Sequence, residues 1–200
     1  MSTASIERSA KRFVIQWRDT ERDLFQGLRS SLRPRRLDAL QRATSHFIIA
    51  RNFARAFDVQ AGRARLEPVL EIFDEVRQVP LRAGDLESAV MQLARRLGSA
   101  YGGRILISAA TKLLWLAHRH PAVIYDSRAC RTLGVSPGNY AAYLAKWRAA
   151  FGEQEADLRA ICARLAMSAS KDAPLSHDIG AEWFRHRVFD IYLYDAGTPG

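Results

Sequence analysis

Apolar residues recur every three or four positions along most of this chain, which is the spacing of an amphipathic α-helix. Residues 5–28 and 35–57 both follow it, and we expect a turn at Pro34 between them. The apolar positions of these two stretches include Phe13, Trp17, Leu24, Leu28, Leu37, Leu40, Phe47 and Phe57. Further helices are expected over residues 64–79, 85–103, 104–120, 136–165 and 181–197.

Residues typical of helix ends mark the expected boundaries of these helices. Asp85 is placed as an N-cap, and Ser136 followed by Pro137 is typical of the start of a helix. Gly152 predicts a kink or a division in the long helix that follows. Residues 166–178 are interpreted as a loop.

The pattern therefore predicts an all-α fold, a compact multi-helix domain without internal repeats or a clear linker. Residues 1–200 are expected to form one domain, or one domain built from two helical lobes with the active site between them.

The most unusual part of the pattern lies in the middle of the chain. The first dozen positions of residues 104–120 carry almost no charge after Arg104, which predicts the most buried helix of the protein. Pro121 ends this helix, and residues 122–125 are too few to pair as a sheet and predict an extended connector. Asp126 then heads a short helix, whose first N–H groups and dipole favour its ionised form. Two interpretations are open: a plain N-cap, or a preorganised negative charge that stabilises a cationic transition state.

Composition narrows the class of protein. The chain has 200 residues and is 48% hydrophobic, which is enough for a core. No apolar run reaches the roughly 18 residues of a membrane span, and the N-terminus lacks the apolar middle of a signal peptide, so we expect a cytoplasmic protein. Cys130 and Cys162 sit in no cluster of zinc-ligand spacing, and no metal or cofactor is expected.

Charge indicates a polyanionic partner. Lys plus Arg number 30 against 21 acidic residues, a formal net charge of +9, and only four of the basic residues are lysines. Arginine binds phosphate through a planar fork and stacks on bases, so nucleic acid is the first candidate. A GC-rich genome also favours arginine over lysine, so the net charge carries more of this argument than the arginine bias does.

The stretch SAATKLLWLAHRHPAVIYDSRACRTLG carries a family resemblance. The segment from Gly102 to Gly134 resembles the catalytic segment of the helix-hairpin-helix DNA glycosylase superfamily, and most of all the bacterial 8-oxoguanine DNA glycosylase-like proteins. In that superfamily an apolar helix follows the hairpin, a proline-containing connector follows the helix, and an aspartate caps the next helix. The resemblance covers roughly residues 85–197 and is most specific from Ser108 to Asp126.

The resemblance implies a DNA glycosylase that flips a modified base out of the duplex and cleaves its N-glycosidic bond. The base would be 8-oxoguanine or another modified base. Asp126 would be the catalytic carboxylate. Lys112 would be a catalytic amine that forms a Schiff base, although it lies one helical turn closer to Asp126 than the family's lysine, whose place falls on Ser108. The alternative for Lys112 is a stem packed on the core with its ammonium reaching solvent or DNA.

The resemblance and the neighbouring residue types also suggest DNA-contacting residues. The expected DNA-binding residues are Gly102, Gly103, Arg104, Ser108, Arg128 and Arg131. The expected base pocket consists of Trp115, His118 and Tyr125. Core packing is the alternative for the two aromatic rings, and solvent exposure is the alternative for the arginines. Asp190 and Asp195 are interpreted as surface or capping residues.

The expected partner is therefore double-stranded DNA with a modified base, bound by a cytoplasmic, nucleoid-associated protein. The alternative function is a non-enzymatic helical nucleic-acid-binding protein on the same scaffold. A helical interaction protein whose positive charge is incidental is the third hypothesis.

Overall fold

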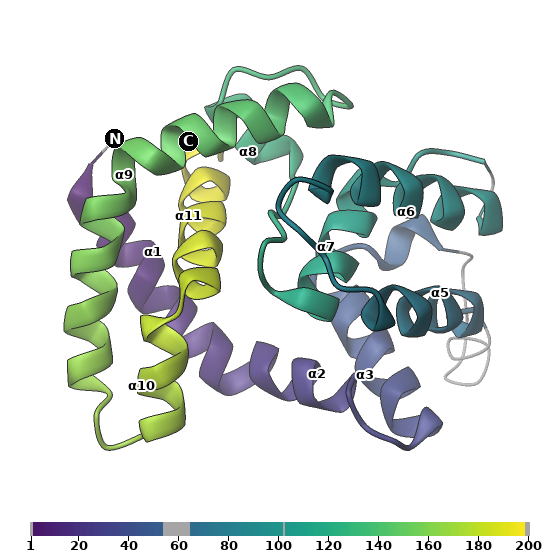
Figure 1. The fold of residues 1–200 in the computed structure, drawn as a ribbon, viewed down its shortest axis with the longest axis horizontal. Coiled ribbons are helices and arrows are strands. Elements are labelled where there is room, and N and C mark those ends of the chain that lie inside the picture. Colours follow the sequence, from purple (N-terminus) through teal and green to yellow (C-terminus); the bar gives the residue numbers. More distant parts are fainter. Residues whose placement is uncertain (1, 54–64, 102, 199–200) are drawn as a thin grey trace. The chain divides into compact units, whose positions relative to one another are not determined.

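The computed structural model describes residues 2–53, 65–101 and 103–198. All regular secondary structure in these ranges is helical, which confirms the all-α prediction (Figure 1). The chain is divided between two compact units. Unit 1 comprises Met1–Arg18 and Val123–Gly200, and unit 2 comprises Asp19–Ala122. An active site between two lobes stays a prediction.

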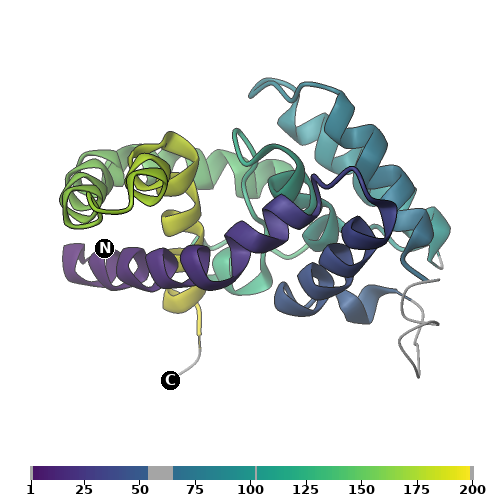
Figure 2. The same cartoon turned by 90° about the horizontal axis from the view of Figure 1, so that it is seen from below.

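Unit 1 is built around α11 (Glu182–Ala196). Trp183, Phe184 and every residue from 186 to 193 are buried. The helix is covered because it contacts α1 (Thr3–Gln16), α8 (Ser127–Thr132), α9 (Tyr140–Ser168) and α10 (Ala173–Gly180). Figures 1 and 2 both show α1 beside α11. A helix with neighbours on so many sides has no wholly polar face, and its polar residues must find partners inside the protein.

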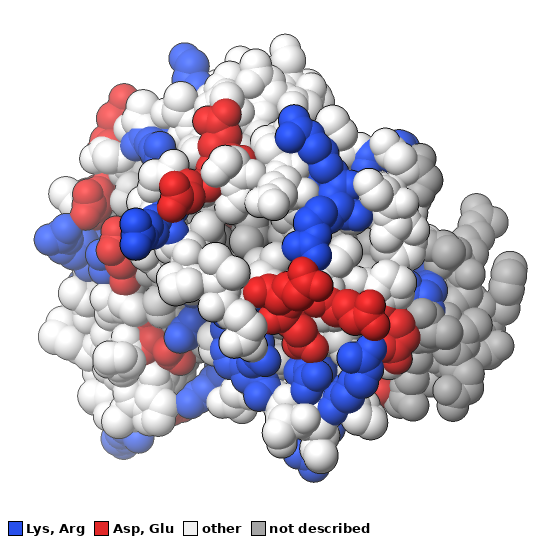
Figure 3. Space-filling model, turned by 45° about the vertical axis from the view of Figure 1, so that its right-hand side comes forward, with Lys and Arg blue, Asp and Glu red and all other residues white. Residues whose placement is uncertain are grey.

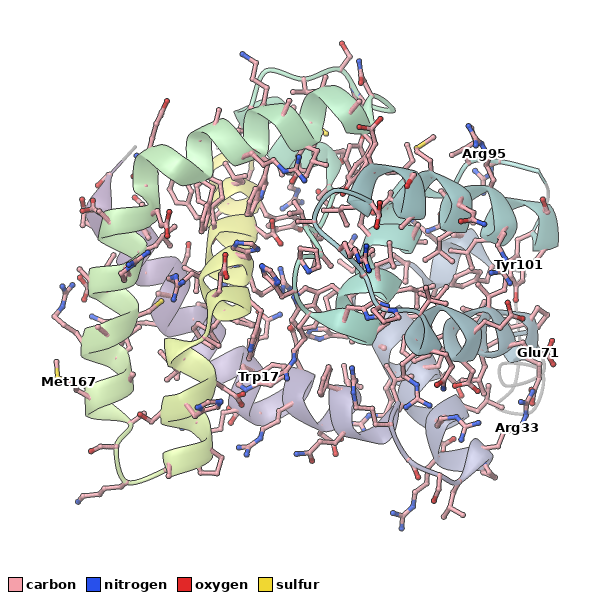
Figure 4. All side chains as sticks on the ribbon, viewed as in Figure 1. Trp17, Arg33, Glu71, Arg95, Tyr101 and Met167 are labelled. Atoms are coloured by element: carbon pink, nitrogen blue, oxygen red, sulfur yellow. The ribbon has the colours of Figure 1, made fainter. Side chains whose placement is uncertain are left out.

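Aromatic residues attach the first helix to the C-terminal helices. The ring of Phe13 lies 4.5 Å from that of Phe184, and the ring of Trp17 lies 4.7 Å from that of Trp183. The indole N–H of Trp17, marked in Figure 4, also donates to Oδ2 of Asp178 on α10 over 2.9 Å. Unit 1 is therefore discontinuous in sequence, since residues from the two ends of the chain share one core.

Unit 2 is built around α7 (Ile107–His118), which contacts α5 and α6. Within α7, all of which is described, only Ser108 and His118 are not buried. This confirms the prediction of a helix that is apolar on nearly all faces. The other elements of the unit are α2 (Arg22–Gly27), α3 (Arg33–His46), a short 3₁₀ turn (Ala50–Asn52), α5 (Glu67–Gln78) and α6 (Leu86–Ala100), and a π-helical turn (Trp17–Glu21) leads into it.

The helices α6 and α7 form a helical hairpin. The Leu106 N–H donates to the carbonyl of Ala94 over 3.2 Å, and the Gly103 N–H donates to the carbonyl of Gly98 over 2.6 Å. A Cβ atom on Gly98 would lie 1.8 Å from the carbonyl oxygen of Arg104. Glycine at position 98 therefore allows the turn to lie directly on the end of α6.

The helix expected over residues 35–57 is shorter than predicted. It is α3, which begins at Arg33 and ends at His46. Pro34 lies in its first turn, where the fixed φ of proline suits a helix, and not in the preceding turn. Ile48 has a φ of 56°, which takes the chain out of the helical direction. Residues 54–57 of the expected helix lie outside the described residues.

The start of α9 was predicted too early, at Ser136 and Pro137. The helix begins at Tyr140, and Oδ1 of Asn139 accepts the N–H of Ala142 over 3.0 Å. Gly138 has a φ of 94°, which is incompatible with the first turn of a helix.

Residues 166–178 are mostly helical, contrary to the expected loop. The helix α9 continues to Ser168 without interruption, and it bends about midway (Figure 1). Because the helix is continuous, the predicted division at Gly152 is wrong. Gly152 is the one glycine of α9, and glycine is a known cause of bending in helices. The helix α10 follows, with Oδ1 of Asp172 accepting the N–H of Leu175 over 3.0 Å.

Opposite charges lie side by side on unit 2. Arg36 pairs with Asp74 over 3.0 Å between α3 and α5. Arg33 and Glu71, labelled in Figure 4, approach to 3.5 Å between the same helices. Figure 3 shows acidic and basic side chains gathered next to one another on this side of the protein.

Among the described helices, none combines the length and the apolar character that a membrane span requires.

Candidate functional site

Asp126 sits where the extended connector meets α8, as predicted. Its backbone is extended, with φ −143° and ψ 148°, and its Oδ1 accepts the N–H of Arg128 over 3.0 Å. Its carbonyl accepts the N–H of Cys130 over 2.9 Å, which starts the helix. The residue is half-buried, so the carboxylate is fixed by the helix yet partly accessible. The N-cap is confirmed, and the catalytic role stays a prediction.

The connector before Asp126 is buried and belongs to no helix, and the backbone where it ends, at Asp126, is extended. Side chains from two helices hold Ile124 within it. Its N–H donates to Oδ2 of Asp190 over 3.1 Å, and its carbonyl accepts the hydroxyl of Tyr143 over 2.8 Å. Oδ1 of Asp190 accepts the indole N–H of Trp147 over 2.8 Å. These contacts bring α9, α11 and the connector together within unit 1.

Asp190 corrects a prediction, because it is neither a surface nor a capping residue. Only 3% of it is exposed. The sequence offered one signal, since Asp190 lies inside the run VFDIYL, where apolar neighbours on both sides indicate a helix without a solvent face. Asp195 does lie near the surface, and its Oδ1 pairs with Arg12 over 2.8 Å.

Tyr125 lies in the core of unit 1. Its hydroxyl accepts the N–H of Gly138 over 2.6 Å, and its ring is edge-on to those of Tyr143 at 5.0 Å and Tyr140 at 6.0 Å. Burial is the main cause that raises the pKa of Tyr125 to about 12. The core interpretation is therefore favoured over stacking on a flipped base.

Arg128 and Arg131 both bind the end of α11. The guanidinium of Arg128 lies 4.6 Å from the ring centre of Tyr194 and donates to the hydroxyl of Thr198 over 3.2 Å. Arg131 donates to the carbonyl of Gly197 over 3.0 Å. Arginines at the C-terminal end of a helix complement its dipole, so these contacts explain both residues without DNA. Their phosphate contacts stay a prediction.

Lys112 belongs to unit 2 and is buried, with 7% of the residue exposed. Its Nζ donates to Oγ of Ser108, one turn earlier on α7, over 3.0 Å. Ser108 occupies the position at which the resembling family has its lysine. The lysine of this chain is therefore hydrogen-bonded to the residue at that position. The sequence pattern placed both residues on one face of the helix, and the structure shows the bond between them.

Trp115 and His118 lie on the same helix in different environments. Trp115 is fully buried and packs edge-on against Phe47 at 5.9 Å, which favours its core interpretation. Nε2 of His118 lies 3.1 Å from the carbonyl of Val76. Burial, more than any other cause, lowers the pKa of His118. Both residues are held by contacts within unit 2.

The turn before α7 carries the remaining predicted residues. Gly103 has a φ of 79°, a conformation that favours glycine, and it is exposed. Arg104 is also exposed. Gly102 lies outside the described residues. Gly103 and Arg104 therefore remain accessible to a partner, which is what the predicted DNA contact requires.

The predicted residues thus fall into two groups. Tyr125, Asp126, Arg128 and Arg131 lie on α8 or directly before it in unit 1, and the other described residues of the prediction lie on α7 or its preceding turn in unit 2. Within each unit taken by itself, the described residues gather no three side chains that could ligate a metal ion.

Comparisons with known proteins add no relative to this picture. No protein-family model, curated protein or solved structure matches the chain.

Proposed function

We propose that this chain is a DNA N-glycosylase that excises a modified base from duplex DNA, with Asp126 as its catalytic carboxylate. The observation that carries the proposal is the setting of Asp126. Its carboxylate is held by the first turn of α8, is partly accessible, and follows a buried connector and an apolar helix in the order of the resembling superfamily.

The proposed reaction needs a fixed negative charge. When the C1′–N bond breaks, the base leaves with the bonding electron pair and the sugar becomes a cationic oxocarbenium species. Asp126 stabilises that cation. Water then supplies the oxygen that joins C1′ and the proton that the departing base takes up. A carboxylate that is already oriented stabilises the transition state without reorganising during the reaction.

The test is base release from duplexes that each carry one modified base, 8-oxoguanine among them. Asp126→Asn should lower the single-turnover rate about 100-fold or more, because the developing cation loses its counter-charge. Asparagine is as good an N-cap as aspartate, so the melting temperature should hardly change. Asp172→Asn is the matched control, because Asp172 caps α10 through the same kind of bond at 3.0 Å. That variant should release base at the wild-type rate.

Equal rates for Asp126→Asn and Asp172→Asn would refute a catalytic Asp126. Lys112→Ala addresses the amine separately, because borohydride trapping of the protein on DNA requires a Schiff base. Trapping in the wild type that disappears in Lys112→Ala would assign the lysine.

A non-enzymatic DNA-binding protein is the second candidate, and the net charge of +9 favours it as much as the first. Salt-sensitive binding to every duplex in the panel, with no base released from any of them, would decide for this candidate.

A further inference from the structure

A buried carboxylate in unit 1 accepts a hydrogen bond on each of its two oxygens. Asp190 is 3% exposed. Its Oδ2 accepts the N–H of Ile124 over 3.1 Å, and its Oδ1 accepts the indole N–H of Trp147 over 2.8 Å. Burying a carboxylate is unfavourable unless it is well hydrogen-bonded. The two bonds tie α11 to the connector on one side and to α9 on the other.

The same short connector is held at a second point. The hydroxyl of Tyr143, on α9, donates to the carbonyl of Ile124 over 2.8 Å. Both backbone polar groups of Ile124 are thus bound by side chains rather than by a neighbouring strand. Asp126 lies two residues further on, where α8 begins. The backbone of Ile124 and Tyr125 leads directly into Asp126, so the path of these two residues sets the direction of the Asp126 side chain.

We propose that Asp190 is a positioning residue, which orients the carboxylate of Asp126 by anchoring the backbone at Ile124. Its catalytic consequence rests on the proposed glycosylase function, whereas the anchoring itself does not. Side-chain type supports the assignment. An extended segment without a partner strand leaves its N–H groups unsatisfied, and an ionised carboxylate forms the stronger kind of hydrogen bond with such a donor.

The variant Asp190→Asn removes one of the two acceptor oxygens and adds an NH₂ group that faces a donor. Either Ile124 or Trp147 then loses its acceptor. The second substitution Trp147→Phe removes one donor, so in the double variant the side-chain oxygen left at position 190 no longer has to serve Trp147 and can accept the N–H of Ile124. A phenyl ring at position 147 retains the aromatic contact with Phe151, whose ring centre lies 4.9 Å from that of Trp147. The double variant should therefore regain what Asp190→Asn loses.

Hydrogen exchange measures the anchoring directly and needs no activity. The amide of Arg128 donates to Asp126, so its exchange rate reports on how well that carboxylate is held. We expect faster exchange at Ile124 and at Arg128 in Asp190→Asn, with recovery at Arg128 in the Trp147→Phe double variant. The amide of Leu175, which donates to Asp172, is the internal control. Unchanged exchange at Arg128 would overturn the proposal, even if Ile124 became faster.

Base release measures the consequence. We expect Asp190→Asn to slow single-turnover release about 10- to 100-fold with the dissociation constant for DNA unchanged, because small displacements of a catalytic group have effects of this size. Combined with Asp126→Asn, it should slow release no further, since the residue acts through Asp126. If release by the double variant is slowed by the product of the two single-variant factors, the catalytic part of the proposal is overturned.

If Asp190→Asn does not fold, Tyr143→Phe tests the premise that anchoring the backbone at Ile124 orients Asp126, because it removes only the hydroxyl that binds the Ile124 carbonyl. Arg128 should exchange faster in that variant, and wild-type exchange there would overturn the proposal. If the wild type releases no base, the proposed function fails, and exchange at Arg128 still decides whether Asp190 positions Asp126.

Discussion

At the scale of single residues, environment decides what each aspartate does. Asp126 caps α8 and stays partly accessible, Asp190 is buried between Ile124 and Trp147, and Asp195 pairs with Arg12 near the surface. All three have the same carboxylate, and the sequence places each on or beside a helix. The difference arises from which other helices cover them, and it separates a candidate for chemistry from an anchor of the backbone.

The bond between Lys112 and Ser108 should contribute measurably to stability. Ser108→Ala removes the hydroxyl that a buried ammonium donates to, and hydrogen bonds to charged groups contribute about 1.5–3 kcal/mol. We expect the free energy of unfolding in urea to fall by that amount. Ser99→Ala is the control, because its hydroxyl bonds an exposed carbonyl on α6. A fall no larger than that of the control would mean that Ser108 does not hold the lysine.

At the scale of elements, glycines have opposite roles in two helices. Gly98 sits against the carbonyl of Arg104 and permits the close turn of the α6–α7 hairpin, whereas a Cβ atom on Gly152 would meet nothing within 4 Å beyond its own stretch of helix. The sequence pattern predicted a structural role for Gly152 and none for Gly98. Local sequence cannot distinguish a glycine needed for close approach from one that is merely tolerated.

Alanine substitutions should therefore change stability in opposite directions. Gly98→Ala forces the turn away from α6 and should lower the free energy of unfolding by about 1–3 kcal/mol or more. Gly152→Ala should raise it by about 0.5–1 kcal/mol, because glycine is a poor helix former. Chemical denaturation of both variants checks this pair. Destabilisation by Gly152→Ala would show instead that the bend of α9 needs glycine.

At the scale of the whole molecule, charge rather than shape suggests the partner. The net charge of +9 is carried mostly by arginines, and many of them are engaged in internal contacts, as Arg128, Arg131 and Arg36 are. Arg104 is exposed at the turn before α7 and remains the clearer candidate for a phosphate contact. Affinity for DNA should therefore depend on a subset of the basic residues.

DNA binding should weaken steeply with salt. Neutralising about six phosphates predicts a log–log slope of roughly −5 for the association constant against salt concentration. Arg104→Gln should make the slope less steep by about one, as expected for one lost phosphate contact. Arg164→Gln is the control, because Arg164 is an exposed arginine that lies 3.5 Å from Glu7. Binding without salt dependence would exclude a contact dominated by phosphates.

Sequence by itself determined the all-α class, a buried helix within residues 104–120, the non-helical connector after it and the cap at Asp126. These features depend on local propensity and on the period of apolar residues, which neighbouring positions in the chain carry. Boundaries were predicted less well, since Asn139 rather than Ser136 caps α9 and α10 replaces an expected loop.

Only the tertiary structure decided how the candidate site is supported. Asp190 and Tyr143 reach Ile124 from helices that are distant in the sequence, and the first helix joins the core of the last one through Phe13 and Phe184. Burial and hydrogen-bond partners are properties of how helices pack together. The helical period shows which residues share a face, but it does not show which other helix will cover that face.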